Sequence, residues 1–180
     1  ISGLLAPTSG HVSVAGFDIV KEGKKAKASL GVVPQEIALY EDLPAIETNL
    51  VGAYGIAVDA EDNLYVLNRR HSKIYRIGPD GIARTIVGTG ERGFNGDGIP
   101  ANKAMVSWPN HLVENAQGEL IIADSSNYRI RVVGKDGIIR TIGGTGEKGF
   151  SGDGGPATEA KISGASAIAI DREGNIYFAD

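Results

Sequence analysis

The sequence contains no cysteine and very few other residues with specialised side-chain chemistry. Its 180 residues include three histidines, one methionine and one tryptophan. The absence of cysteine excludes disulfides, zinc-thiolate sites and cysteine nucleophiles. The sequence also lacks a run of about 18 apolar residues, the length of a membrane-spanning helix, so we expect no direct membrane insertion.

The chain also lacks an excess of positive charge. It has 18 basic and 22 acidic residues, which gives a formal net charge of −4. This balance argues against a nucleic-acid groove or an anionic membrane surface as the main partner. The lysines at positions 21, 24, 25 and 27 are interrupted by Glu22, a pattern typical of the solvated face of a short helix. We expect no nucleic-acid partner.

A long internal repeat is the strongest positive signal. The segment GIARTIVGTGERGFNGDGIPANKA, residues 81–104, recurs 56 positions later at residues 137–160, and 17 of the 24 positions are identical. Repetition at a fixed long period indicates one supersecondary unit that is copied and stacked. Residues 1–50 lie outside this period.

Each repeat reads as four short β-strands. Runs rich in valine, isoleucine and tyrosine alternate with turn residues about every ten positions, and the links are of hairpin size. The expected strands are 55–59, 63–68, 73–78 and 83–88 in the first copy, then 111–115, 119–124, 128–134 and 138–144 in the second. A third copy begins at 167 and includes two strands up to residue 180.

A four-stranded antiparallel meander in tandem copies is typical of propeller blades, of which a closed ring needs about 4–8. The predicted fold is therefore mainly β: a partial β-propeller of two four-stranded blades and half of a third over residues 51–180, preceded by a small α/β fragment. Open blade edges and faces favour self-association.

The repeat resembles the NHL-repeat family of β-propellers. The likeness lies in the GIAVD and NLYV runs of the first copy, in DSSNYRIR at 124–131, and in the connector GTGxxGFxGDGxPA that occurs twice. It implies a non-catalytic scaffold whose loops and blade faces bind a protein, a peptide or a carbohydrate.

The connector contains a G-x-G-x-x-G pattern, as in dinucleotide-binding proteins. That fingerprint must open a helix, and the following F-N/S-G-D-G does not permit one. One carboxylate per loop, Asp97 or Asp153, also falls short of the six to eight oxygens that calcium takes. We expect these aspartates to cap backbone N–H groups, and Phe94 and Phe150 to anchor the loops in apolar surface between blades.

The turns between second and third strands differ between the copies. In the second copy, Asp124 and Asn127 are expected to satisfy free backbone groups of the turn. In the first copy the corresponding residues are 68–71, Asn-Arg-Arg-His. The positive cluster there is either a local recognition feature or a solvated turn, and we favour the solvated turn.

Catalysis finds little support in the sequence. Enzymatic propellers place metal ligands where the leading strands of several blades converge, and the candidates here are Asn110 and His111. Their repeat equivalents are Tyr54 with Gly55 and Ser166 with Ala167, so we expect no catalytic residues and no metal site. Trp108, just before them, is expected to pack in the core.

Residues 1–50 have a different character, with a predicted hairpin at 11–20, a helix near 23–29 and a strand at 30–33. The segments GLLAPTSG at 3–10 and GVVPQ at 31–35 closely resemble the nucleotide-binding domain of ABC transporters. The resemblance implies that Gln35 is the Q-loop glutamine near magnesium and the attacking water. It also implies a cytoplasmic location if this part is authentic, whereas the propeller part is compatible with an extracytoplasmic one.

The phosphate-binding G-x-x-x-x-G-K-[ST] motif and the L-S-G-G-Q signature are absent from residues 1–50. Phosphoryl transfer depends on that phosphate cradle, so Gln35 is expected to be inactive here and no cofactor is expected; ATP and magnesium would belong only to an intact ABC domain. The two parts meet near residues 49–52 without a Gly/Ser/Pro linker, as expected either for a splice of two partial domains or for a natural fusion. The functional alternatives are a propeller scaffold and a fragment of an ABC transporter ATP-binding protein.

Overall fold

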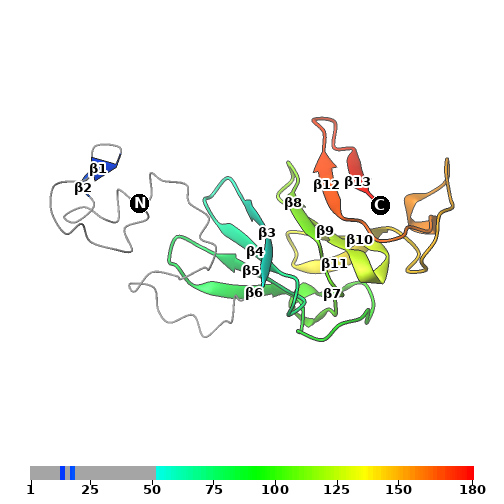
Figure 1. Cartoon of the computed structure of the whole chain (residues 1–180), viewed down its shortest axis with the longest axis horizontal. Coiled ribbons are helices and arrows are strands. Elements are labelled where there is room, and N and C mark those ends of the chain that lie inside the picture. Colours follow the sequence, from blue (N-terminus) through cyan, green and yellow to red (C-terminus); the bar gives the residue numbers. More distant parts are fainter. Residues whose placement is uncertain (1–12, 15–16, 19–51) are drawn as a thin grey trace. The chain divides into compact units, whose positions relative to one another are not determined.

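The computed structural model describes residues 13–14, 17–18 and 52–180 (Figure 1). The chain divides into two compact units, Ile1–Ala38 and Leu39–Asp180. In the first unit, β1 (Ser13–Val14) pairs antiparallel with β2 (Phe17–Asp18). The predicted helix at 23–29, the predicted strand at 30–33, Gln35 and the junction near residue 50 lie outside the described residues.

In the second unit, the described residues begin with a four-stranded antiparallel meander, the first blade, in the order β3-β4-β5-β6. Consecutive strands pair with each other through tight turns. The strands are β3 (Ala53–Val58), β4 (Leu64–Asn68), β5 (Lys73–Ile77) and β6 (Ala83–Val87).

The second blade repeats this meander and gains a fifth strand at its outer edge. Its order is β7-β11-β10-β9-β8, so β7, which comes from the connector after the first blade, pairs with the last strand of the second. The bounds are β7 (Ile99–Pro100), β8 (His111–Glu114), β9 (Leu120–Asp124), β10 (Arg129–Val133) and β11 (Ile138–Gly143).

The third copy forms a hairpin of β12 (Ala167–Ile170) and β13 (Ile176–Ala179). Single turns of 3₁₀ helix lie at η1 (Ala101–Lys103), η2 (Ser125–Asn127) and η3 (Ala157–Glu159). The prediction of a mainly β partial propeller with four-stranded antiparallel blades is confirmed. The sequence pattern did not predict β7, because a two-residue strand inside a glycine-rich connector has no periodicity.

A side-chain cage closes the turn between the first two strands of each copy. Asp59 accepts hydrogen bonds from the backbone N–H groups of Glu61 and Asn63 through Oδ1, and from Asn63 Nδ2 and Tyr65 Oη through Oδ2, at 2.7–3.1 Å. Burial opposes ionisation of Asp59, but these four donors outweigh it and lower its pKa. The same cage recurs 112 residues later around Asp171.

The second copy builds this cage with the chemical groups exchanged. Asn115 Oδ1 accepts from the backbone N–H groups of Gln117 and Glu119, while Asn115 Nδ2 donates to the Glu119 carboxylate at 2.9 Å. An amide and a carboxylate remain paired across the turn, with their positions swapped. The turn therefore requires complementary polar groups at two positions rather than one particular residue.

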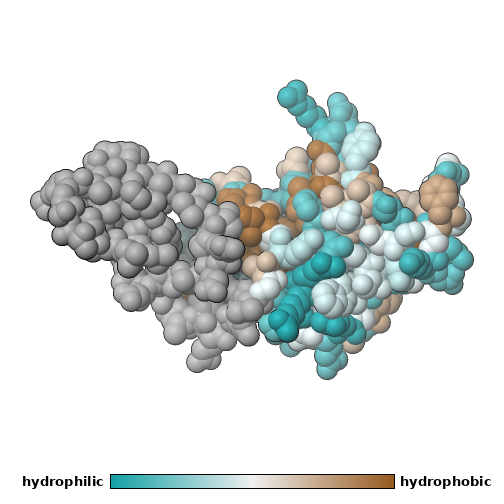
Figure 2. Space-filling model, in the orientation of Figure 1, coloured by the Kyte–Doolittle hydropathy of each residue, from teal (hydrophilic) through white to brown (hydrophobic). Residues whose placement is uncertain are grey.

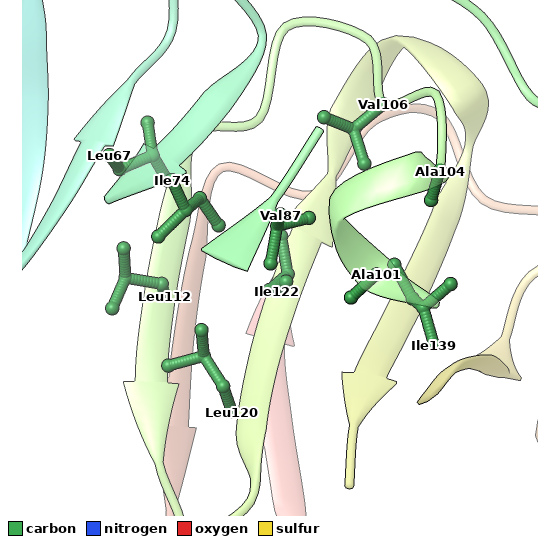
Figure 3. Close-up of a cluster of buried hydrophobic side chains, with 10 residues drawn as sticks. All are labelled: Leu67, Ile74, Val87, Ala101, Ala104, Val106, Leu112, Leu120, Ile122 and Ile139. Carbon is green, nitrogen blue, oxygen red and sulfur yellow. The ribbon is translucent and has the colours of Figure 1, made fainter. Parts of the chain in front are cut away.

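The main core lies between the first two blades (Figure 3). Side chains from β4, β5 and β6 meet side chains of the connector and of the second sheet, and η1 covers the outer end. The buried members are Leu67, Ile74, Val87, Ala101, Ala104, Val106, Leu112, Leu120, Ile122 and Ile139. Burial of these apolar faces against each other is the main force that stacks the blades.

A second core lies between the second blade and the β12-β13 hairpin. Its buried members are Ile121, Ala123, Ile130, Ile162, Ala165 and Ile168. Figure 2 shows apolar surface where β3 and β12 lie in Figure 1. On β3, the side chains of Ile56 and Val58 are exposed.

Two equivalent glycines allow the connector to leave each blade. Gly88 and Gly144 have φ of +93° and +84°, and a Cβ atom at either position would collide with a backbone carbonyl oxygen, that of Ser72 or that of Tyr128. Gly137 also has a positive φ, +72°, but a Cβ atom there would meet nothing within 4 Å. At Gly88 and Gly144 any side chain would therefore clash with backbone, whereas at Gly137 there is space for one.

We predict that Gly144→Ala destabilises the second unit much more than Gly137→Ala. The control, Gly137→Ala, should lower the free energy of unfolding by about 1 kcal/mol, because alanine is strained in the left-handed conformation. Gly144→Ala should cost about 3 kcal/mol or more, because the clash with the Tyr128 carbonyl is added. Urea unfolding followed by circular dichroism measures both; equal losses would contradict the steric argument.

Candidate functional site

The first connector, residues 88–110, runs from the end of β6 to the start of β8. It is held by a polar network that we call the connector clamp, centred on Asp124 and Arg131. Asp124 ends β9, and its side chain is fully buried. Its Oδ1 accepts the backbone N–H of Ser107 at 2.7 Å, and its Oδ2 accepts Asn127 Nδ2 at 2.8 Å and Arg131 Nη1 at 3.3 Å. Asn127 Nδ2 also donates to the Gly93 carbonyl oxygen at 2.6 Å.

Arg131 extends the clamp to the tip of the connector. Its side chain is fully buried, and Nη2 donates to the Gly96 carbonyl oxygen at 3.0 Å and to Asp97 Oδ1 at 2.8 Å. The side chains of β9, η2 and β10 therefore hold the connector at Gly93, Gly96, Asp97 and Ser107. Residues 88–98, the glycine-rich part of the connector, contribute no buried side chain to the main core, so hydrogen bonds to the backbone are what the clamp adds there.

Burial raises the pKa of Asp124 to about 6, against the opposing effects of the Ser107 N–H, Asn127 and Arg131. The carboxylate is therefore ionised at neutral pH and pairs with a buried guanidinium. A buried pair of this kind becomes costly when one partner is removed, because the other charge is left uncompensated.

The predicted roles of the loop residues need correction in the first connector. Asp97 pairs with Arg131 instead of capping backbone N–H groups. Phe94 is 39% exposed and lies under two guanidinium groups, with Arg129 Cζ at 3.8 Å and Arg131 Cζ at 4.8 Å from its ring centre. Asp124 and Asn127 bind the connector rather than their own turn, since Ser107 and Gly93 are distant in sequence.

The second connector follows the same path up to the clamp. The backbone N–H groups of Gly144 and Thr145 bond the carbonyls of Ala157 and Ala160, as those of Gly88 and Thr89 bond Ala101 and Ala104. The backbone N–H of Ser163 donates to the Asp180 carboxylate at 2.7 Å, repeating the Ser107–Asp124 contact.

The anchoring expected of Phe150 is not found, and Asp153 is exposed as well. Phe150 is 83% exposed, and none of the cation–aromatic contacts found in residues 52–180 includes its ring. Sequence reasoning did not identify Asp180, although it is the repeat equivalent of Asp124.

A second cluster lies on the face that we call the connector face, formed by the turns 69–72 and 125–128 with residues 52–54 and 108–110. Here Arg69 Cζ lies 4.9 Å from the ring centre of Tyr54 and 5.0 Å from that of Trp108. Arg92 Cζ lies 4.2 Å from the Trp108 ring centre. We call Tyr54, Arg69, Trp108 and Arg92 the arginine–aromatic stack.

Trp108 has an unusual backbone conformation within this stack. Its φ is +46°, in the left-handed region, and its repeat equivalents Gly52 and Gly164 also have positive φ, +93° and +139°. Glycine adopts this conformation without strain, whereas another residue in a sparsely populated region pays about 1–3 kcal/mol. The expectation that Trp108 packs in the core is wrong, since its side chain is only half-buried.

Asn110 and His111 are close to the stack in sequence. Asn110 Nδ2 donates to the Ala165 carbonyl oxygen at 3.5 Å, and His111 is half-buried on β8. Within residues 13–14, 17–18 and 52–180, there is no group of three or more histidine, aspartate or glutamate side chains that could hold a metal ion. In the same ranges no helix has the length and apolar character needed to cross a membrane.

The chain is similar to two different classes of known protein. Over 47 residues it is 55% identical to the linearmycin resistance ATP-binding protein LnrL of Bacillus subtilis, a match that covers 26% of this chain and 15% of that protein. The chain therefore spans a small part of this relative. No family model matches the chain.

The structural neighbours are propeller-like. A Bacteroides thetaiotaomicron protein of unknown function superposes with a TM-score of 0.58 at 26% identity, over 66% of this chain and 30% of that one. An auxiliary nutrient binding protein from the same organism has a TM-score of 0.60 at 21% identity, over 69% and 34%. This chain spans about a third of each, and the likeness supports the propeller fold.

We predict that Asp124→Ala costs about 3–5 kcal/mol of unfolding free energy, because it leaves Arg131 charged and buried beside a single remaining carboxylate. The matched control is Asp80→Ala, which removes the exposed Asp80–Arg84 pair of 2.7 Å and should cost less than about 1 kcal/mol. Thermal and urea unfolding of both variants measure the difference. Similar losses would show that the clamp does not hold the blades together.

Proposed function

We propose that this chain is a non-catalytic propeller scaffold that binds a protein or another ligand on its connector face. The observation that carries the proposal is Trp108. A tryptophan stands where the other two copies have glycine, in a backbone conformation that favours glycine, and its partly exposed side chain lies beside two guanidinium groups. Strained residues of this kind cluster at functional sites.

The blade architecture does not require the stack. Its four positions in the next copy, 56 residues later, are Asn110, Ser125, Lys148 and Gly164. The connector there follows the same backbone hydrogen bonds without any aromatic ring among these residues. A side chain that the fold does not need and that strains the backbone is best explained by binding.

The ligand classes that fit such a face are protein, peptide and carbohydrate. Aromatic side chains and arginine are the residues enriched at binding hot spots, because they offer large contact areas and directed donors. The clamp supports this use of the face, since it fixes the connector that carries Trp108 and Arg92. A rigid platform binds with a smaller entropic cost than a mobile loop.

A second candidate function rests on the 47-residue similarity to an ATP-binding protein. Under this alternative, the chain is a fragment of an ABC transporter ATP-binding protein, and Gln35 contributes to a nucleotide site only in an intact domain. The sequence similarity that supports this alternative is 55% identity, but it covers only 26% of the chain.

We predict that the purified chain hydrolyses no magnesium-ATP above background, because the phosphate-binding loop and the signature motif are absent from it. Release of inorganic phosphate and a nucleotide-binding titration measure this, with Gln35→Ala as the control variant. A rate that Gln35→Ala abolishes would favour the ABC alternative.

We predict that Trp108→Gly abolishes ligand binding while it changes the unfolding free energy by less than about 1 kcal/mol, since relief of backbone strain offsets the lost contacts. The labelled chain is applied to a glycan array and a peptide array, beside Trp108→Gly and Trp108→Phe. Retention of ligands by Trp108→Phe and their loss in Trp108→Gly supports the proposal. Equal binding by Trp108→Gly would contradict it.

A further inference from the structure

Three arginines gather on the connector face without a carboxylate partner. In residues 52–180 the arginines that form ion pairs are Arg84, Arg131 and Arg140. Arg69, Arg70 and Arg92 form none with a described carboxylate, and Arg92 Nη2 donates to the Arg70 carbonyl oxygen at 3.2 Å, which brings them together. In a chain with a net charge of −4, this local concentration of unpaired positive charge attracts an anion.

The stack leaves these guanidinium groups able to bind a carboxylate. A guanidinium that lies over an aromatic ring has its flat face covered, while its N–H groups project outward in the plane of the group. These N–H groups match the two oxygens of a carboxylate in a bidentate arrangement. Arg69 lies over the rings of both Tyr54 and Trp108. Its Nε is buried without a hydrogen-bond partner among the described residues, so a carboxylate would be bound by its terminal Nη groups.

Tyr54 adds an apolar surface beside this charge. Its side chain is 62% exposed although Arg69 covers one face of the ring, so aromatic surface remains open. Aromatic rings of this kind pack against the C–H faces of ring-shaped ligands while their polar edge remains hydrated. An aromatic surface and a guanidinium less than 5 Å from the ring centre suit a ligand whose carboxylate is attached directly to a ring.

We infer that the arginine–aromatic stack binds an acidic saccharide, with a uronate ring on Tyr54 and its carboxylate on Arg69 and Arg92. This deepens the proposed scaffold function and rests on it. An acidic peptide shares the carboxylate and is the competing occupant, because Tyr54 lies on β3, the edge strand of the first sheet, where a peptide can add as a further strand. The exposed aromatic ring beside a guanidinium favours the saccharide.

The experiment uses Trp108, the single tryptophan of the chain, as the reporter. The 180-residue chain is titrated with trigalacturonate and, as the matched control, with its fully methyl-esterified form, which keeps the rings and removes the charges. We expect a saturable change in tryptophan fluorescence with the acid and at least tenfold weaker binding of the ester. Added salt should weaken binding of the acid, because it screens exposed charges.

Variants then assign the binding to the stack. Arg69→Gln and Arg92→Gln should each weaken trigalacturonate binding about tenfold or more, as expected for loss of a charge-assisted hydrogen bond. The control Arg84→Gln changes an exposed arginine at the opposite end of the same sheet and should bind like the unmodified chain. Calorimetric titration gives the affinities independently of fluorescence, and circular dichroism checks that each variant is folded.

Several outcomes would overturn the inference. Equal affinity for the ester would exclude charge recognition, and equal weakening by Arg84→Gln would exclude the stack. Tighter binding of a triglutamate peptide than of trigalacturonate would identify an acidic peptide as the ligand. Absence of saturable binding would also refute it, whereas a neutral ligand that requires Trp108 on the arrays would leave the scaffold function standing.

Discussion

The path of the connector between the two complete blades depends on one buried ion pair, Asp124 with Arg131. The pair lies inside the second blade, but it binds the connector of the first, through Ser107 on one side and Gly96 with Asp97 on the other. Apolar burial stacks the sheets and holds the connector at Ala101, Ala104 and Val106, but it does not hold the glycine-rich residues 88–98. The clamp fixes the path of these residues through directed hydrogen bonds to the backbone at Gly93, Gly96 and Ser107.

The polar networks of the structure act at two levels. The turn cages around Asp59, Asn115 and Asp171 are local, and they close each hairpin with residues at most six positions apart. The clamp joins segments 17 to 35 residues apart and therefore couples one copy to the next. The arginine–aromatic stack is not part of either network. The equivalent positions between the second and third copies have other residues. The fold thus supplies a rigid frame, and the stack adds chemistry to one face of it.

The sequence predicted the blades well because strands and turns are local features. Alternating apolar residues, Asp-Gly turns and the 56-residue period predict every long strand to within about two residues, whereas β7 and the path of the connector depend on contacts that have no periodicity. Asp97 was expected to bind nearby backbone, but its partner Arg131 lies 34 positions away. A partner so distant in sequence can be identified only from the tertiary structure.

The candidate site was less predictable than the fold, although one signal was present. Alignment of the copies puts Trp108 opposite Gly52 and Gly164, and a positive φ at those glycines would have marked the tryptophan as unusual. The sequence favours a solvated turn for the positive residues 69–71, because it does not reveal that the Arg69 guanidinium lies over two aromatic rings.

The central claim is that the clamp makes the two complete blades one cooperative unit, and native-state hydrogen exchange tests it most directly. Leu67 of β4 and Ile122 of β9 are both fully buried on opposite sides of the shared core. If the blades are coupled, the amides of both strands should exchange with opening free energies that agree within about 0.5 kcal/mol, the precision expected for one unfolding event. Opening of the first blade at a free energy several kcal/mol lower than that of the second would contradict the claim.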